Sequence, residues 1–343
     1  MTMNIKVTTL GELPMVYAIA AVPRADGLHF LAATELYGRW LHFSPPHYHA
    51  SIASEGPGGV MSIVPLRGKD GSVVVIERAY PIYHGDDSRI SIARPPAQGT
   101  GLWEKQVIAD VPFLHRLAVI DGPGSSQTLV AATMVSGKRH QDDWSQPGQV
   151  LAATLSTGGG PLRLLPIVEK LSRNHGMYLP PKDGVATLLV SGIEGLFALS
   201  RAGDQWSSRQ LLAHDVSDVA IFDLDGDGRD EVITIEPFHG NRFVIYRDTG
   251  AGLEKAVEIP GAFGHVVWAG WLRGQRSLVL GDRAGRKELR LLTFRGDSSL
   301  QFETTVLDSG GGPANIVVIH EPKRDLILSA NHARGDVSLF ELT

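Results

Sequence analysis

Histidine is the residue type whose placement in this sequence most suggests chemistry. Neutral imidazole nitrogens bind transition metals, and an imidazole beside a carboxylate is a common general base. A single loop histidine is usually only solvated or hydrogen-bonded, so the argument rests on the set. Seven of the 13 histidines stand in polar segments at the ends of apolar runs: His84, His115, His140, His175, His239, His265 and His332.

One polar turn, "SGKRHQDDWSQPG" at residues 136–148, carries more functional groups than its backbone requires. A turn needs only Gly, Asn, Asp or Pro. We interpret His140 as a candidate general base oriented by Asp143, and His84, beside another Asp pair, as the second candidate. Trp144 has two open interpretations: it stacks on the apolar face of a sugar ring, or it locks the loop.

The elements that position these residues are short β-branched runs bounded by Gly, Asp, Asn and Pro. Only "PIVEKLSRN" (166–174) suggests a short helix. The runs recur as units of three or four strands with a period of roughly 45 to 60 residues, which is typical of a β-propeller. Seven units are visible: 15–44, 58–94, 113–155, 174–200, 217–247, 263–295 and 313–342.

The sequence therefore predicts an all-β protein, a single-domain seven-bladed β-propeller over residues 1–343; a β-solenoid or two sandwiches are the alternatives. In a propeller, the residues that begin each inner strand share a face with the turns between the second and third strands. His115, His175 and His265 begin inner strands, so we expect them to converge on Zn, Mn or Mg. A hydrogen-bonded plug is the other interpretation.

Other polar residues are expected on the same face. Arg116 is a candidate electrophile or carboxylate clamp, and Tyr178 a candidate donor or base. Five residues are candidate substrate contacts: Trp144, His239, His332, Arg283 and Glu194.

A second motif, "DLDGDGRDE", alternates carboxylates around a glycine turn between two strands. An EF-hand would need Glu at the twelfth position, where Thr234 stands. With its flanking strands, "VAIFDLDGDGRDEVITI" resembles the FG-GAP or VCBS-type repeat of β-propellers. The resemblance implies a structural calcium ion in this hairpin, held by Asp223, Asp225, Asp227, the carbonyl group of Arg229, and Glu231.

Composition limits the partners. A formal charge of −5 without a basic stripe argues against nucleic acid and anionic membranes. The apolar run "MVYAIAAV" (15–22) is too short to span a bilayer and makes a poor signal peptide, so we expect a cytoplasmic protein. The oligomeric state stays open.

Histidine-rich mouths on seven-bladed propellers resemble those of metal-dependent sugar lyases and dehydratases, including oligogalacturonate lyases and FG-GAP-containing aldos-2-ulose dehydratases. The resemblance implies a lyase, dehydratase or isomerase that removes an α-proton from a small-molecule or oligosaccharide substrate. The alternative is a non-catalytic propeller scaffold that binds a protein or glycan. A catalytic mouth should be buried with histidines facing one another, whereas a docking face should be flat with exposed aromatic residues.

Overall fold

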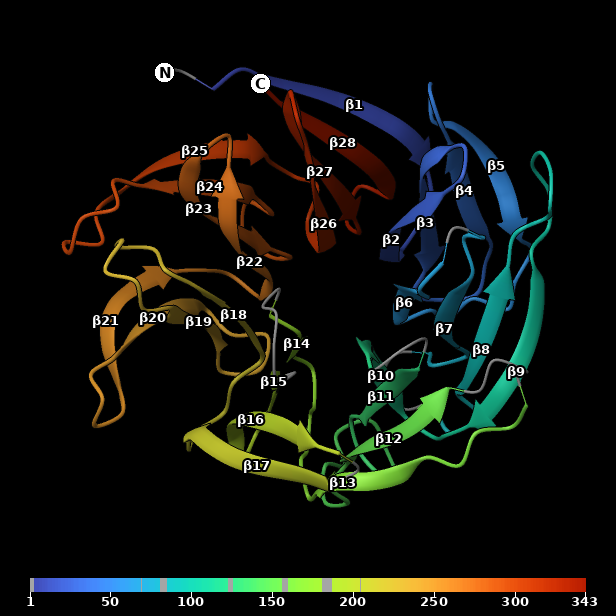
Figure 1. Ribbon diagram of the computed structural model, residues 1–343, viewed down its shortest axis with the longest axis horizontal. Helices are drawn as coiled ribbons and strands as arrows, with labels where there is room; N and C mark the ends of the chain where they lie inside the picture. The colour runs from blue at the N-terminus through green and yellow to red at the C-terminus, as the bar shows by residue number, and fades with distance from the viewer. Residues whose placement is uncertain are drawn as a thin grey trace. The chain divides into compact units, whose positions relative to one another are not determined.

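The computed structural model describes residues 3–68, 70–80, 85–122, 126–155, 160–180, 187–203 and 205–343. Within these ranges no helix occurs, and 28 strands form seven four-stranded sheets (Figure 1). This confirms the predicted all-β class, a seven-bladed β-propeller. The predicted helix at 166–174 is wrong, because Leu165–Glu169 form strand β13. In the described part of the chain, no helix has the length and apolar character needed to cross a membrane.

The chain divides into two compact units, Leu10–Asn174 and a second unit made of Met1–Thr9 with His175–Thr343. The expectation of a single domain stays a prediction.

Three sheets belong to the unit Leu10–Asn174, and in each the strands pair in chain order. The first contains β2 (Val16–Arg24), β3 (Gly27–Thr34), β4 (Trp40–Ser44) and β5 (His49–Ser54). The second contains β6 (Ser62–Pro65), β7 (Val73–Glu77), β8 (Arg89–Arg94) and β9 (Glu104–Asp110). The third contains β10 (Leu114–Asp121), β11 (Gln127–Thr133), β12 (Gln149–Leu155) and β13 (Leu165–Glu169).

Three further sheets in chain order belong to the other unit. They are β14 (Met177–Tyr178), β15 (Thr187–Gly192), β16 (Gly195–Ala202) and β17 (Gln205–Leu212); β18 (Asp218–Phe222), β19 (Glu231–Glu236), β20 (Arg242–Asp248) and β21 (Leu253–Pro260); and β22 (Gly264–Leu272), β23 (Gln275–Asp282), β24 (Leu289–Phe294) and β25 (Phe302–Asp308).

The seventh sheet joins both ends of the chain. It contains β26 (Pro313–Glu321), β27 (Arg324–Asn331) and β28 (Asp336–Leu342), and β1 (Ile5–Glu12) pairs with β28 as its outer strand. Backbone hydrogen bonds between Asn4 and Thr343, both 3.0 Å long, extend this pairing. The fourth strand of the last blade thus comes from the beginning of the sequence.

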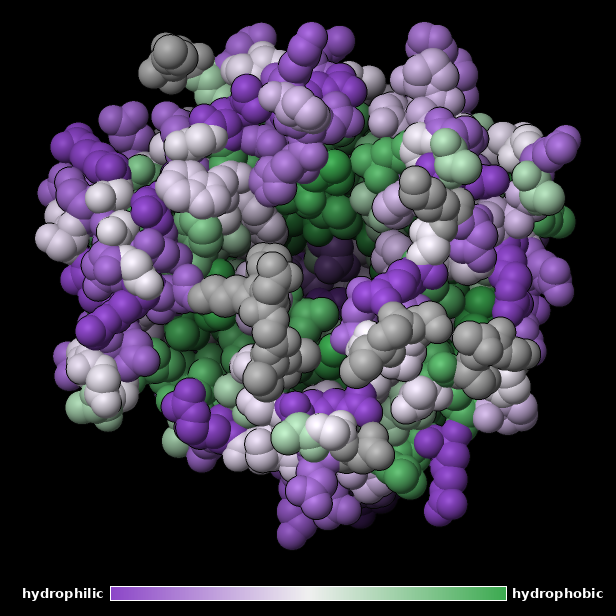
Figure 2. All heavy atoms as spheres, in the orientation of Figure 1, coloured by the Kyte–Doolittle hydropathy of each residue, from purple (hydrophilic) through white to green (hydrophobic). Residues whose placement is uncertain are grey.

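The predicted units match the inner three strands of each sheet and omit the fourth. The outer strands are polar and largely exposed, as in β21 ("LEKAVEIP") and β25 ("FETTVLD"), so they lack the apolar pattern that marks a buried strand. Figure 2 shows hydrophilic side chains over these outer strands and hydrophobic residues further inward.

Apolar packing between successive sheets holds the blades together. Ile233, Ile235 and Phe243 of the sheet β18–β21 share a buried cluster with Leu278 and Leu280 of the sheet β22–β25. Each such buried side chain contributes about 1.5–3 kcal/mol relative to exposure. This packing sets the spacing between the turns that carry the candidate site.

A buried polar residue recurs at or next to the end of the second strand in every sheet. At this position Asp282, the last residue of β23, accepts a hydrogen bond at 2.8 Å from the backbone N–H of Ala262, in the segment before β22. The residues at this position are Thr34, Glu77, Thr133, Ser191, Glu236, Asp282 and Asn331.

Candidate functional site: a histidine cluster

Three histidines of the unit that contains His175–Thr343 surround one buried point. The ring centroid of His175 lies 4.8 Å from that of His239 and 4.9 Å from that of His265, and the rings of His239 and His265 stack at 5.2 Å. One ring nitrogen from each lies within 4.8 Å of the others. His175 is 0% exposed and His265 2%, so these two imidazoles face each other away from water.

The three residues come from three successive sheets. His175 precedes β14, His239 lies in the turn between β19 and β20, and His265 is the second residue of β22. Gly176 lets the chain after His175 approach β18 closely, because a Cβ there would lie 2.3 Å from Ser191 Oγ and 2.8 Å from Asp218 Cα. The segment before β14, the turn between β19 and β20, and the start of β22 therefore carry the three histidines of the cluster.

His239 is presented by a tight turn. Its backbone has φ of 49°, which is uncommon for a residue other than glycine. Its backbone N–H donates to Ser217 Oγ at 3.1 Å. The next residue, Gly240, has no room for a side chain, since a Cβ would lie 2.0 Å from the carbonyl oxygen of Glu236. These contacts fix the backbone that carries the ring.

Two phenylalanines enclose the same ring. Phe238 stacks on His239 with centroids 4.0 Å apart, and Phe263 stacks on its ring at 4.4 Å. Phe238 also meets His175 edge to face at 5.7 Å. Phe263 is itself 38% exposed, whereas His175 and His265 are buried, and their burial strengthens electrostatic interactions inside the cluster.

A hydrogen bond determines the tautomer of His265. Its Nδ1 lies 2.7 Å from the carbonyl oxygen of Ala314, so Nδ1 carries the proton and Nε2 keeps its lone pair. Arg283 Nη1 lies 3.4 Å from this Nε2, and Arg283 Nη2 lies 2.9 Å from Nε2 of His332. Since guanidinium only donates, both Nε2 atoms act as acceptors.

This donor set fits a divalent transition metal. Three neutral imidazoles with an open fourth position are the ligands of many zinc sites, and a backbone partner on the remote nitrogen, as in His265, is typical of metal-bound histidine. Tetrahedral ligation would need the three nitrogens about 3.3 Å apart. The observed spread allows this with small ring movements.

The cluster differs from the expected set in one member. His175 and His265 were predicted as ligands and lie together, whereas the third place is taken by His239, which the sequence had suggested for substrate contact. His115 lies in β10 of the other unit, where its Nε2 is 3.3 Å from Tyr17 Oη. Arg116 follows it in β10 and is half-buried. His84 lies outside the described residues.

The loop that contains His140 has a different organisation from the expected pair. The Asp143 carboxylate accepts from Arg139 Nε at 2.8 Å and from Ser145 Oγ and N at 2.5 and 3.0 Å. These hydrogen bonds hold the pKa of Asp143 well below its usual range. His140 is exposed, and its carbonyl group accepts from the Asp143 backbone N–H at 3.1 Å. Asp143 thus orders the loop through Arg139 and Ser145.

Trp144 lies between two cations. Lys138 Nζ is 3.5 Å from the centre of the indole, and the guanidinium carbon of Arg173 is 4.5 Å away. Burial, followed by the nearby charge of Arg173, lowers the pKa of Lys138. Between the two interpretations of Trp144, these contacts favour the loop lock.

Two further candidates have structural contacts. Tyr178 packs against apolar clusters and donates to the carbonyl oxygen of Ile221 at 3.4 Å. Burial raises the pKa of Tyr178, so the phenol stays protonated. Glu194 lies in the turn between β15 and β16, where its carbonyl group accepts from Gln210 Nε2 at 2.8 Å.

The acidic hairpin between β18 and β19 gathers the expected carboxylates. One oxygen from each of Asp223, Asp225 and Asp227 lies within 4.8 Å of the others, which suits a hard cation. Glu231 instead accepts from the backbone N–H of Leu224 at 2.7 Å, and burial raises the pKa of Glu231 to about 7.

Two arginines compete with a cation for this hairpin. Arg276 Nη1 lies 3.1 Å from Asp223 Oδ2, and Arg247 Nη2 lies 2.8 Å from Asp225 Oδ2. Their charges neutralise part of the acidic loop. The Arg229 N–H donates to Asp227 Oδ1 at 2.8 Å. Calcium therefore stays a prediction.

Sequence reasoning missed the role of His239 and both phenylalanines. One signal was present: each phenylalanine lies within two residues of a histidine, in "PFHG" and "AFGH". Aromatic residues so close to histidines at successive turns could have indicated an enclosed cluster.

Comparisons with known proteins show the fold. No protein-family model matches the chain, and no curated protein matches its sequence. A "putative 6-phosphogluconolactonase" from Bacteroides uniformis is similar with a TM-score of 0.54 and 13% identity over 95% of this chain and 94% of that one. One from Bacteroides fragilis has a TM-score of 0.54 and 13% identity over 97% and 98%.

A third similar structure is the extracellular domain of a "putative one component system" from B. thetaiotaomicron. It has a TM-score of 0.60 and 10% identity over 98% of this chain, which spans 39% of that longer one. At these identities the similarities establish that the chain has the β-propeller fold, and they assign no activity.

Proposed function

We propose that this protein is a metal-dependent enzyme that removes an α-proton from a sugar acid. The resulting enolate then either loses its β-substituent by elimination or is protonated again to give an isomer. The observation that carries the proposal is the convergence of His175, His239 and His265 on one buried point beside Arg283. It meets the criterion of buried histidines that face one another, and so favours an active site over the alternative, a flat scaffold face.

The residues suggest a division of roles. Arg283 can bind a carboxylate in a bidentate manner, which suits an anionic sugar. A divalent ion bound to the three histidines would supply Lewis-acid polarisation of the substrate carboxylate. Phe238 and Phe263 stack on the His239 ring, and the burial of His175 and His265 keeps water from this centre.

His332 is the best-placed base. When a substrate carboxylate draws the Arg283 guanidinium away, Nε2 of His332 can accept a proton from the substrate in place of the hydrogen bond from Arg283. The α-C–H bond then breaks, its proton moves to Nε2, and its electron pair enters the carboxylate as an enolate held by Arg283. In an elimination, that electron pair forms the Cα–Cβ double bond as the β-substituent leaves with the proton held by His332; in an isomerisation, a proton from solvent adds to the opposite face of Cα and inverts that carbon.

His140, Asp143, His84, Arg116 and Tyr178 remain proposed catalytic residues, and Trp144 and Glu194 proposed substrate contacts, each of which mutation can test.

The proposal is tested by measuring the metal content of the purified protein. Protein purified without a histidine tag should bind about one equivalent of Zn²⁺ or Mn²⁺. A His175→Ala, His239→Ala double variant should lose it, and His115→Ala should retain it. The metal-loaded protein would be assayed with uronates and unsaturated products followed by ultraviolet absorbance, and with gluconolactones as a competing class. Absence of metal from the folded wild type, or equal metal in the double variant, would refute this function.

A further inference from the structure

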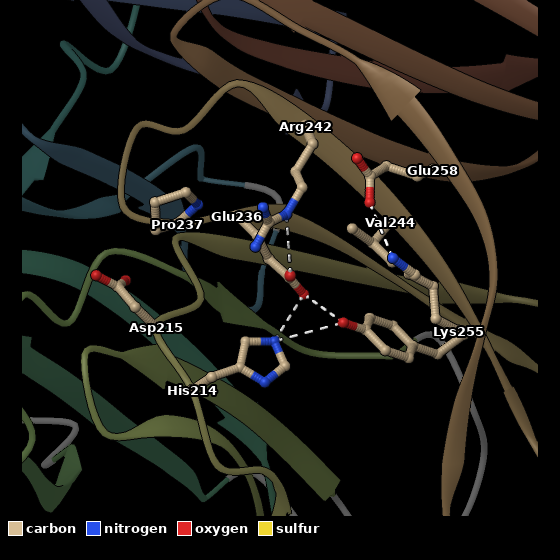
Figure 3. Close-up of a pocket in the computed structure, with 9 residues that line it drawn as sticks. His214, Asp215, Glu236, Pro237, Arg242, Val244, Lys255 and Glu258 are labelled. Atoms are coloured by element: carbon tan, nitrogen blue, oxygen red, sulfur yellow. Dashed lines mark hydrogen bonds and ion pairs between the residues drawn. The ribbon is translucent and has the colours of Figure 1, made fainter.

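A second group of chemically active residues lies outside the histidine cluster. It lines a pocket of about 510 Å³ formed by the segment before β18 and by strands β19, β20 and β21. Figure 3 shows His214 and Arg242 directed at the carboxylate of Glu236, which also accepts a hydrogen bond from Tyr246 Oη. We propose that this pocket binds an uncharged, polyhydroxylated ligand, a sugar ring.

The equivalent position in another sheet of the same protein allows a direct comparison with Glu236. Glu77 occupies the same place at the end of β7 that Glu236 occupies at the end of β19. Its carboxylate accepts from Arg89 Nε at 3.1 Å, Ser91 Oγ at 2.7 Å and Lys105 Nζ at 2.9 Å. Lys105 stands opposite Ala93 in the sheet, and the small alanine leaves its side chain a path to the carboxylate. The hydrogen-bonding positions around the Glu77 carboxylate are therefore occupied by the protein's own side chains, and we call this the closed site.

The same register positions are filled differently around Glu236. Arg242 pairs with Glu236 as Arg89 pairs with Glu77, and four residues further along stands Tyr246 in place of Ala93. Lys255 is opposite Tyr246, as Lys105 is opposite Ala93. Tyr246 Oη donates to Glu236 Oε1 at 2.9 Å, and Lys255 turns instead to Glu258 at 3.1 Å.

The exchange of an alanine for a tyrosine therefore opens the site. The buried carboxylate is satisfied by Tyr246, by Thr234 Oγ1 at 2.6 Å and by His214 Nε2 at 3.1 Å. Lys255 no longer crosses the sheet to reach it. Its side chain and that of Arg242 remain at the pocket wall, where both are about half exposed.

The charges of the wall favour a neutral ligand. Arg242 Nε lies 3.6 Å from Glu236, and Lys255 is paired with Glu258. With Asp215, the wall carries three carboxylates against two cations, so an anion would meet excess negative charge and would have to break an ion pair. A hydroxyl group both donates and accepts, and can bridge such pairs without unbalancing them.

The size and the floor of the pocket agree with a sugar. The volume lies in the range of about 300 to 1,000 Å³ that small-molecule sites occupy. The floor is formed by Val244 and Tyr246 of β20, which are 0% and 7% exposed, so the edge of the tyrosine ring is the apolar surface that a pyranose ring would meet there, while the polar wall meets its hydroxyl groups.

Binding would be measured by saturation-transfer NMR and calorimetry with the methyl glycosides of glucose, galactose and mannose, and with galacturonate as the anionic probe. At least one neutral glycoside should bind with a millimolar dissociation constant, and galacturonate should displace it only weakly, because galacturonate bound beside Arg283 does not compete for this pocket. Arg242→Gln and Lys255→Met should each weaken that binding at least fivefold. The matched variants Arg89→Gln and Lys105→Met, at the equivalent positions of the closed site, should leave it unchanged.

A His175→Ala, His239→Ala variant separates this site from the histidine cluster, because it should keep the same affinity for the neutral glycoside. Circular dichroism would establish that each variant is folded. The proposal is overturned if no neutral glycoside binds the wild type at 50 mM, if galacturonate displaces the bound glycoside more strongly than a second neutral glycoside does, or if folded Arg242→Gln binds as the wild type does. It is also overturned if the double histidine variant abolishes binding.

Discussion

Arg283 donates a hydrogen bond to His332, with Nη2 of the arginine 2.9 Å from Nε2 of the histidine. The other terminal nitrogen of the same guanidinium lies 3.4 Å from Nε2 of His265. Because Nδ1 of His265 is committed to Ala314, Nε2 is the one atom that this ring can offer to a metal. Arg283 and a metal ion therefore compete for the same lone pair.

Arg283→Gln should bind Zn²⁺ more tightly than the wild type, by about three- to thirtyfold, because a repelling charge and a competing donor are both removed. The same variant should lose affinity for a uronate, because the carboxylate clamp is gone. Metal titrations with a chromophoric competitor measure the first effect, and uronate titrations of metal-loaded protein measure the second. Equal zinc affinity in the two proteins would show that Arg283 does not control this site.

Asp143→Asn should destabilise the protein by about 1–3 kcal/mol, because it removes the charged acceptor for Arg139 and Ser145 from a buried position. His140→Gln changes an exposed side chain and should shift the unfolding free energy by less than about 0.5 kcal/mol. Denaturant unfolding measures both. If Asp143 instead orients His140 as a base, the two variants should show equal losses of kcat with unchanged stability.

Trp144→Leu should cost about 1–2 kcal/mol of stability, because the indole loses its contacts with Lys138 and Arg173. Lys138→Met keeps the aliphatic contact and should cost about half as much. Thermal unfolding of both variants is the measurement. A Trp144→Leu protein as stable as the wild type, but with a raised KM for a sugar, would restore the interpretation of Trp144 as a substrate contact.

Calcium should raise the unfolding temperature of the wild type, since an ion that binds only the folded acidic hairpin stabilises it by mass action. Asp225→Asn should abolish this shift, because the variant removes one carboxylate of the cluster. Differential scanning calorimetry with calcium or with a chelator tests the effect. Identical unfolding temperatures in the two buffers would mean that Arg247 and Arg276 replace the ion in this chain.

The protein should lose stability in mild acid through His42. Burial, then the neighbouring His29 and Arg24, lowers the pKa of His42 to about 4, from 6.5. Because the folded form disfavours protonation, the stability contribution is complete above about pH 6.5 and is lost as the pH falls toward 4. It amounts to about 3 kcal/mol.

The environment of His42 involves few titratable groups. His29 Nδ1 lies 2.9 Å from His42 Nε2, and Asp26 Oδ1 lies 2.9 Å from His29 Nε2. Unfolding free energies of the wild type and of His42→Gln, measured from pH 7.5 to 4.5, should converge as the pH falls. Parallel profiles would show that His42 does not titrate with unfolding.

Much of the scaffold could be read from the sequence alone. Periods of β-branched residues located the inner three strands of every blade to within a few residues, because buried strands must be apolar in this pattern. Three of the four expected carboxylates of the acidic hairpin, Asp223, Asp225 and Asp227, also met, since residues so close in sequence converge through local turn geometry.

The tertiary structure decided which distant side chains meet. The sequence repeat places His115, His175 and His265 at equivalent positions in their units. Equivalent positions in a repeat do not specify how far apart the side chains lie. His175, His239 and His265 come from three successive sheets whose packing brings their turns together, while His115 belongs to the other compact unit. Likewise, the sequence contains both Ala93 and Tyr246, but only the cross-strand register shows that they stand at equivalent places opposite Lys105 and Lys255, where the exchange of alanine for tyrosine decides whether the lysine reaches the buried glutamate.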